Sequence, residues 1–207
     1  MQDHHDTSSI PRCQIRAVYD AKTIRVYQAY SDSIANSALA KGAFASPPFK
    51  MERMTWIKPS FLWMMYRAGW GLKDAGQKRI LAIDISRDGF EWALAHGCLS
   101  HPHEGMTREE WEEKKKASPV RVQWDPERDL LLRPLKHRAI QIGLSGEAVN
   151  LYVNQWICKI TDVTDMANIV REFVNLNKLD KAQTMLPKEL PYPLSAAVEN
   201  RLIITNL

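Results

Sequence analysis

An apolar stretch near the middle of the chain, KRILAIDIS at residues 78–86, is the clearest strand signal in the sequence. Its side chains are apolar with little alternation, as expected for a strand that is covered on both faces. We therefore expect it to be a central strand of a sheet. Segments rich in β-branched and aromatic residues predict further strands at 54–58, 120–125, 138–144 and 157–164, and either two short strands or one bent strand at 14–20 and 23–30.

Helical patterns lie between these strands. Ser31 or Ser33 can cap a helix that Gly42 ends, and Ser60 can cap a second helix that runs to a following glycine. Further helices are predicted at 87–97, 107–117, 146–156 and 165–177. Because strands and helices mix without a regular β-α-β rhythm, the predicted fold class is α+β rather than a doubly wound sheet.

The 207 residues are enough for one domain with a full hydrophobic core. The polar start predicts a disordered tail at residues 1–12, followed by a single domain at 13–207. Three widely separated cysteines in no paired pattern argue against a disulfide framework. No secretion signal is visible and no apolar run approaches about 18 residues, so we expect no membrane span and a cytoplasmic location.

The common phosphate-binding and nucleophile motifs are missing from the sequence. No G-x-G-x-x-G follows a predicted strand, no Walker-type glycine-lysine loop occurs, and no G-x-S-x-G elbow is present. Kinase and Rossmann dehydrogenase functions are therefore not supported. The formal net charge of +4 favours anionic partners only mildly.

One cluster has the chemistry of a zinc site. The stretch HGCLSHPHEG offers four possible ligands, His96, Cys98, His101 and His103. Their spacing matches no closed structural zinc site, so we expect a loop without a metal. A zinc protein built on this cluster is kept as a rival interpretation.

The segment MTWIKPSFLWMMYRAGW at residues 54–70 is unusually aromatic. Its tryptophans are Trp56, Trp63 and Trp70. Aromatic stripes on helices usually pack in a core, so at least two of the three are expected to be buried. Lys58 and Ser60 need another explanation, since a Lys-Pro-Ser turn before a helix presents free backbone N–H groups to an anion. We expect these two residues to face a groove.

A second polar segment, VQWDPERD at residues 122–129, places several carboxylates around a proline. Such a run can supply a general acid or base. It can also be a turn with local ion pairs. Glu127 is kept as a catalytic candidate.

Several segments together resemble the uncharacterised family DUF4291 over nearly the whole chain after residue 12. They are IRAVYDAKTIRVYQAY, RMTWIKPSFLWMMYRAGWG, FEWALAHG, VRVQWDPERD and RAIQIGLSGEAV. Their order also resembles ADP-ribosyltransferase-type domains, especially DNA-modifying DarT toxins and RNA 2'-phosphotransferases. The resemblance implies an α+β fold with a split mixed sheet and flanking helices, and NAD as a substrate.

The resemblance also implies residues that contact NAD. Gln28 occupies the place where many relatives have a histidine for the nicotinamide-side ribose, with Arg25 and Tyr27 beside it. The second signature implies four residues that line the NAD groove, Lys58, Ser60, Tyr66 and Arg67.

The third signature is a catalytic glutamate on a late strand, and Gln141 matches its position, with Arg138 and Trp124 as implied substrate-binding residues. A glutamine keeps the hydrogen bond to the ribose 2'-hydroxyl but lacks the negative charge that stabilises an oxocarbenium-like state. Either Glu127 or Glu147 then supplies the charge, or the chemistry is slow, altered or absent.

The sequence therefore predicts an NAD-binding, ADP-ribosyltransferase-like protein that passes ADP-ribose to an acceptor. DNA or RNA is preferred slightly over protein because of the relatives and the basic net charge. The rival is a catalytically inactive module that binds a nucleotide or nucleic acid in the same cleft. The oligomeric state is left open.

Overall fold

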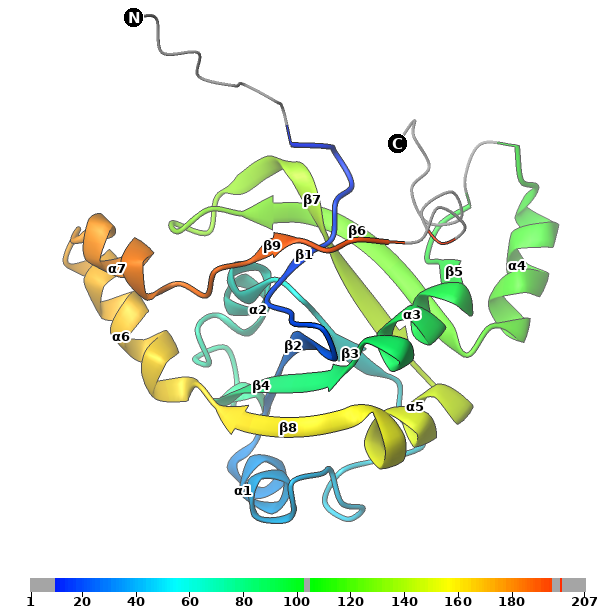
Figure 1. Cartoon of the computed structure of the whole chain (residues 1–207), viewed down its shortest axis with the longest axis horizontal. Helices are drawn as coiled ribbons and strands as arrows, with labels where there is room; N and C mark the ends of the chain where they lie inside the picture. Colours follow the sequence, from blue (N-terminus) through cyan, green and yellow to red (C-terminus); the bar gives the residue numbers. More distant parts are fainter. Residues whose placement is uncertain (1–9, 103–104, 195–197, 199–207) are drawn as a thin grey trace, which may run out of the picture.

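The computed structural model of the chain describes residues 10–102, 105–194 and 198. Within them, β4 (Arg79–Ser86) is the central strand of an antiparallel sheet in the order β2-β4-β8 (Figure 1). Its neighbours are β2 (Thr23–Tyr30) and β8 (Ile157–Asp162). The run Ile80–Ile83 is buried at every position. The central position expected for this apolar stretch is confirmed.

A second sheet is built around a long antiparallel hairpin of β6 (Val120–Arg128) and β7 (Pro134–Leu144). The strand order is β3-β7-β6-β5, with β3 (Thr55–Ile57) antiparallel to β7 and β5 (Gly97–Leu99) parallel to β6. The long hairpin stands above the first sheet in Figure 1.

Strand β5 corrects a prediction from the sequence. The helix expected to reach residue 97 ends at Ala95, and Gly97 opens β5 instead. A Cβ atom at Gly97 would lie 2.7 Å from Cγ2 of Val122, so a side chain there would prevent the close approach of β5 to β6. The glycine that resembles a helix stop is needed for sheet packing.

The two sheets meet at Lys58. The backbone N–H of Tyr27 in β2 donates a 2.7 Å hydrogen bond to the carbonyl oxygen of Lys58, which directly follows β3. Pro59 and Ser60 then lead into α2 (Phe61–Ala68). Side chains of β2, β3 and α2 are therefore brought together at one junction.

Helices pack around the two sheets, and the fold is mixed α+β, as predicted (Figure 1). The remaining helical elements are α1 (Asp32–Lys41), η1 (Ala75–Gln77), α3 (Arg87–Ala95), α4 (Arg108–Ala117), α5 (Glu147–Leu151), the π-helix η2 (Tyr152–Trp156), α6 (Thr164–Asn175) and α7 (Leu179–Met185). The sequence predicted all of these helical regions except η1 and α7.

The ends of α2 follow from its sequence. The hydroxyl of Ser60 accepts a 3.1 Å hydrogen bond from the backbone N–H of Trp63, which satisfies one of the free donors of the first turn. Gly69 ends the helix with a φ of 56°, a left-handed conformation that favours glycine. The predicted cap and stop are both confirmed.

The N-terminal and C-terminal segments lie side by side. Of the strand predicted at residues 14–20, β1 (Arg16–Ala17) pairs with β9 (Leu190–Pro191), and Tyr19 forms an isolated antiparallel bridge with Ile24. The tail predicted at residues 1–12 lies mostly outside the described residues. At its end, the carbonyl oxygen of Arg12 accepts a 2.7 Å hydrogen bond from the backbone N–H of Arg138.

The tryptophan-rich segment contributes to the core. Trp63 and Trp70 are 6% and 9% exposed, whereas Trp56 is half-buried. The expectation that at least two of the three are buried is confirmed. Across the described part of the chain, every helix is too short or too polar to span a membrane.

Candidate functional site

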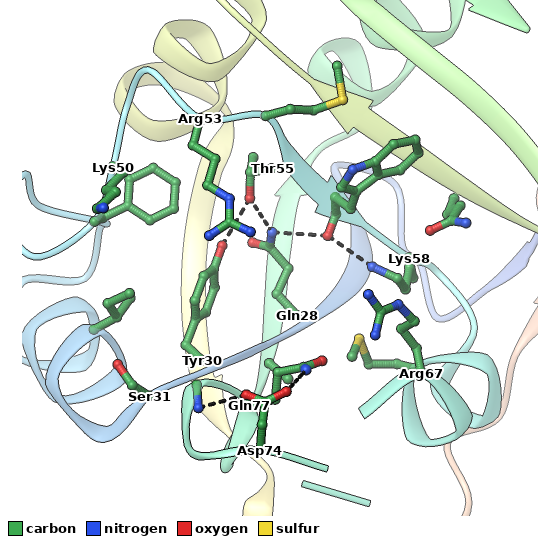
Figure 2. Close-up of a pocket in the computed structure, with 18 of the residues that line it drawn as sticks. Gln28, Tyr30, Ser31, Lys50, Arg53, Thr55, Lys58, Arg67, Asp74 and Gln77 are labelled. Atoms are coloured by element: carbon green, nitrogen blue, oxygen red, sulfur yellow. Dashed lines mark hydrogen bonds between the residues drawn. The ribbon is translucent and has the colours of Figure 1, made fainter. Parts of the chain in front are cut away.

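A cavity of about 650 Å³ opens where the two sheets meet (Figure 2). Its walls come from β2, the start of α1, the loop before β3, strand β3, helix α2, the turn at η1 and the facing strands β6 and β7. Ligand pockets in proteins fall in this size range. The junction between the sheets is therefore the candidate site.

Basic side chains enter the cavity from two sides. Lys50 and Arg53 come from the loop before β3, and Lys58 and Arg67 come from the end of β3 and from α2 (Figure 2). Within the described residues, no ion pair joins any of these four groups to a carboxylate. Lys50, Arg53 and Arg67 form a cationic surface that is open to an anionic ligand.

One carboxylate, Asp74, also lines the cavity. It accepts a 2.8 Å hydrogen bond from the backbone N–H of Gly76 and another from the side-chain amide of Gln77. These two bonds cap the short helix η1, so Asp74 has a structural role at the rim.

A buried glutamine organises one wall. Gln28 is 3% exposed, and its carbonyl oxygen accepts a 2.7 Å hydrogen bond from the phenol of Tyr152. Its amide donates to the hydroxyl of Thr55 at 2.7 Å and to the carbonyl oxygen of Trp56 at 3.1 Å. The phenol of Tyr30 lies 3.0 Å from the same Thr55 hydroxyl. This network fixes the side chains of Gln28, Thr55 and Tyr30 in the cavity wall (Figure 2).

Lys58 is the most unusual group in the cavity. The residue is 5% exposed, and its amino group donates a 3.2 Å hydrogen bond to the carbonyl oxygen of Trp56. The pKa of Lys58 is lowered to about 7, mainly by burial and also by the neighbouring charge of Arg67, while the charge of Asp125 opposes the shift. A large fraction of the amine is therefore neutral near pH 7.

Gln141 reaches the cavity from β7, and a carboxylate lies next to it. Its amide donates a 2.7 Å hydrogen bond to Asp125, whose other oxygen accepts a 2.9 Å bond from the amide of Gln123. Gln123 lies opposite Gln141 in the ladder and lines the cavity beside it. The two glutamines hold Asp125 between them.

From the acidic run at 122–129 the sequence interpretation kept Glu127 rather than Asp125, and it missed the basic residues Lys50 and Arg53. Side chains alternate along a strand, so residues 121, 123 and 125 of β6 share one face. That alternation is a signal that could have placed Asp125 beside Gln123. Lys50 and Arg53 come from an irregular loop, for which the sequence offers no comparable signal.

Glu127 has a different position from Asp125. It is 8% exposed, and its carboxylate accepts a 2.9 Å hydrogen bond from the hydroxyl of Ser60 and a 2.8 Å bond from the backbone N–H of Arg128. Burial raises the pKa of Glu127, while these two donors oppose the rise. Glu127 and Ser60 do not line the cavity; together they hold the start of α2.

Of the twelve residues that the sequence proposed for the site, four line the cavity, namely Gln28, Lys58, Arg67 and Gln141. The other eight, which do not line it, are Arg25, Tyr27, Ser60, Tyr66, Trp124, Glu127, Arg138 and Glu147.

Most of those eight residues have structural contacts instead. Arg25 forms a 2.8 Å ion pair with Asp84, and Arg138 donates to the carbonyl oxygen of the buried Trp124 at 3.0 Å. The ring of Tyr66 stacks on Trp63. Tyr27 is buried in the core, and Glu147 is exposed in the first turn of α5.

Three of the four possible zinc ligands lie within the described residues. The ring of His96 stacks on Trp92, and its Nδ1 atom lies 2.8 Å from the carbonyl oxygen of that residue. Cys98 is buried and His101 is exposed, while His103 lies outside the described residues. In the part of the chain that the structure describes, no three His, Cys, Asp or Glu side chains are grouped as metal ligands would be.

Comparison with known protein families gives a match over residues 14–192 to the model described as "Domain of unknown function (DUF4291)". The chain belongs to the DUF4291 family. The matched region contains every residue of the cavity described above, so the candidate site is part of the DUF4291 domain. A comparison with curated proteins found no match. The family description states no activity, and the function must be argued from the site.

Proposed function

We propose that this DUF4291 protein binds NAD in the cavity and transfers ADP-ribose to an acceptor. The observation that supports this best is the combination of four basic side chains without carboxylate partners in the described residues and a wall of amide and aromatic groups. The pyrophosphate of a dinucleotide suits the basic side chains, and its rings and ribose hydroxyls suit the aromatic and amide groups of the wall.

Each part of the cavity has a role in this proposal. Arg53 and Arg67 bind the pyrophosphate from opposite sides, and Trp56 supplies an apolar surface for a ring. The amide of Gln141 is already bonded to Asp125, which leaves its carbonyl oxygen as the acceptor for a ribose hydroxyl.

The proposed chemistry is cleavage of the nicotinamide glycosidic bond. As nicotinamide leaves, positive charge develops on the ribose, and a nearby negative group lowers the energy of that state. In this chain Asp125 supplies that charge. It does not line the cavity itself, but its carboxylate accepts hydrogen bonds from the amides of Gln123 and Gln141, which do. A nucleic-acid base or phosphate is the preferred acceptor, on the resemblance and the net charge of +4.

One observation favours a second candidate function, a nucleotide-binding module without catalysis. Asp74, the carboxylate that lines the cavity, is already committed to capping η1. Asp125 is covered by the amides of Gln123 and Gln141. A site in which both carboxylates are held by internal hydrogen bonds can bind an anion without accelerating glycosidic cleavage.

Incubation of the purified protein with NAD, followed by chromatography of released nicotinamide, separates the two functions. The transferase proposal predicts steady release that is lost in Arg67→Ala and kept in Arg108→Ala, a control on the exposed face of α4. Binding of NAD without release supports the non-catalytic module. If NAD neither binds nor is cleaved, the transferase proposal is wrong.

A further inference from the structure

The amino group of Lys58 has the surroundings of a reactive lysine. The residue is 5% exposed yet lines an open cavity, and its amino group donates a hydrogen bond to the neutral carbonyl oxygen of Trp56 at 3.2 Å. Lysines held in this way lose part of their charge and become nucleophiles, because a neutral amine has a free lone pair.

The charged groups around Lys58 act on its amine in opposite directions. Arg67, about two turns along α2 from the Lys-Pro-Ser segment, disfavours the ammonium form, and Asp125 on β6 favours it. Arg53, Lys50 and Asp74 line the more distant walls. Burial is the largest of these effects, and together they lower the pKa of Lys58 to about 7.

We propose that Lys58 forms an imine with the carbonyl group of a phosphorylated aldehyde or ketone. The basic side chains of Arg67 and Arg53 would hold the phosphate, and the amine is the nucleophile beside them (Figure 2). The cavity thus combines an anion site with a nucleophile that needs no further activating base.

The step is balanced without an oxidant or reductant. The lone pair of the Lys58 amine attacks the carbonyl carbon, and the electron pair of the C=O bond moves to the oxygen. The nitrogen gives up two protons, the oxygen leaves as water, and a C=N bond remains. The cavity is open, so the water and the protons exchange with solvent.

This inference goes beyond NAD chemistry and does not depend on it. ADP-ribose in its open-chain form is one phosphorylated aldehyde, so a product released in the cavity belongs to the same ligand class. An imine at Lys58 would form equally with other members of that class when no NAD is cleaved.

Pyridoxal 5'-phosphate with borohydride reduction is a suitable probe, since it marks each imine permanently for peptide mapping. We expect one equivalent of label on Lys58 in the wild type, its loss in Lys58→Arg, and no change in Lys41→Arg, an exposed lysine outside the cavity. Inorganic pyrophosphate should protect Lys58 by occupying the basic groups.

The pH dependence provides a second readout that needs no variant. With a pKa of about 7, labelling of Lys58 should rise about tenfold from about pH 6 to about pH 8 and then level off. An ordinary exposed lysine continues to gain reactivity above that range. Label spread over exposed lysines with none on Lys58, or a Lys58 rate that rises without levelling, would overturn the proposal.

Discussion

At the scale of single residues, the site depends on hydrogen bonds that leave few groups free to move. Gln28 is held by Tyr152 and Thr55, and Gln141 is held by Asp125. In contrast, Arg53 and Arg67 enter the cavity without an ion pair to a carboxylate in the described residues. The fixed amides are suited to orient a ligand, whereas the basic groups are suited to bind its charge.

Gln141→Ala tests the residue that the family resemblance places at the catalytic position. If Gln141 acts on the ribose, the variant removes a hydrogen bond made chiefly in the transition state. Turnover of NAD should then fall about 10- to 1000-fold with little change in KM. Steady-state kinetics of nicotinamide release measure both quantities.

Glu127→Gln is the matched comparison for Gln141→Ala. Glu127 supports the start of α2 through Ser60, so its replacement should lower stability more than it lowers turnover. If Gln141→Ala has wild-type kinetics and Glu127→Gln abolishes activity without unfolding the protein, the catalytic role belongs to Glu127.

At the scale of elements, the C-terminal segment is attached to the start of α2 by a buried acid. Glu189 accepts a 2.7 Å hydrogen bond from the backbone N–H of Phe61. The pKa of Glu189 is raised to about 8, mainly by burial and also by the nearby Glu127, while the Phe61 N–H and Arg16 oppose the rise. The segment after α7 is therefore coupled to the helix that carries Arg67.

This pKa predicts a dependence of stability on pH. The folded-state pKa of Glu189 is above the ordinary value of 4.5, so the folded state binds the proton more tightly. The stabilisation from this proton is complete below about pH 4.5 and is lost as the pH rises through about 8. Urea unfolding from about pH 5 to about pH 7 should show a fall in stability that is smaller in Glu189→Gln.

Glu147→Gln is the control for that measurement, because it removes an exposed carboxylate from the first turn of α5. Its pH slope should equal that of the wild type. Lys58 has the opposite effect on stability, since its lowered pKa makes stability rise between about pH 7 and 10.5; the chosen window lies below that range. Equal slopes in the wild type and Glu189→Gln would show that Glu189 does not hold the proton.

At the scale of the whole molecule, local sequence patterns predicted the elements better than their assembly. The apolar run at 78–86 and the Ser60 cap depend on residues that are adjacent in the sequence, and both expectations are confirmed. Gly97 was misread as a helix end because its close contact with Val122 is made between distant strands. The pairing of β1 with β9 likewise joins the two ends of the described chain.

The cavity was only partly predictable for the same reason. Lys58 and Arg67 were found because they share one unusual segment. Alternation along β6 places Asp125 on the same face as Gln123. Arg53, in contrast, was missed because its role arises only when the second sheet packs against the first at the Tyr27–Lys58 hydrogen bond. No periodicity in a single segment contains that information.

The central claim is that this cavity binds NAD, and isothermal titration calorimetry of the wild type beside Arg67→Ala tests it most directly. We expect one NAD bound per chain, and a Kd about 10- to 100-fold weaker in Arg67→Ala, the cost of about one charge-assisted hydrogen bond. Arg108→Ala should bind as the wild type does. No binding at millimolar NAD, or equal affinity in the wild type and Arg67→Ala, would contradict the account.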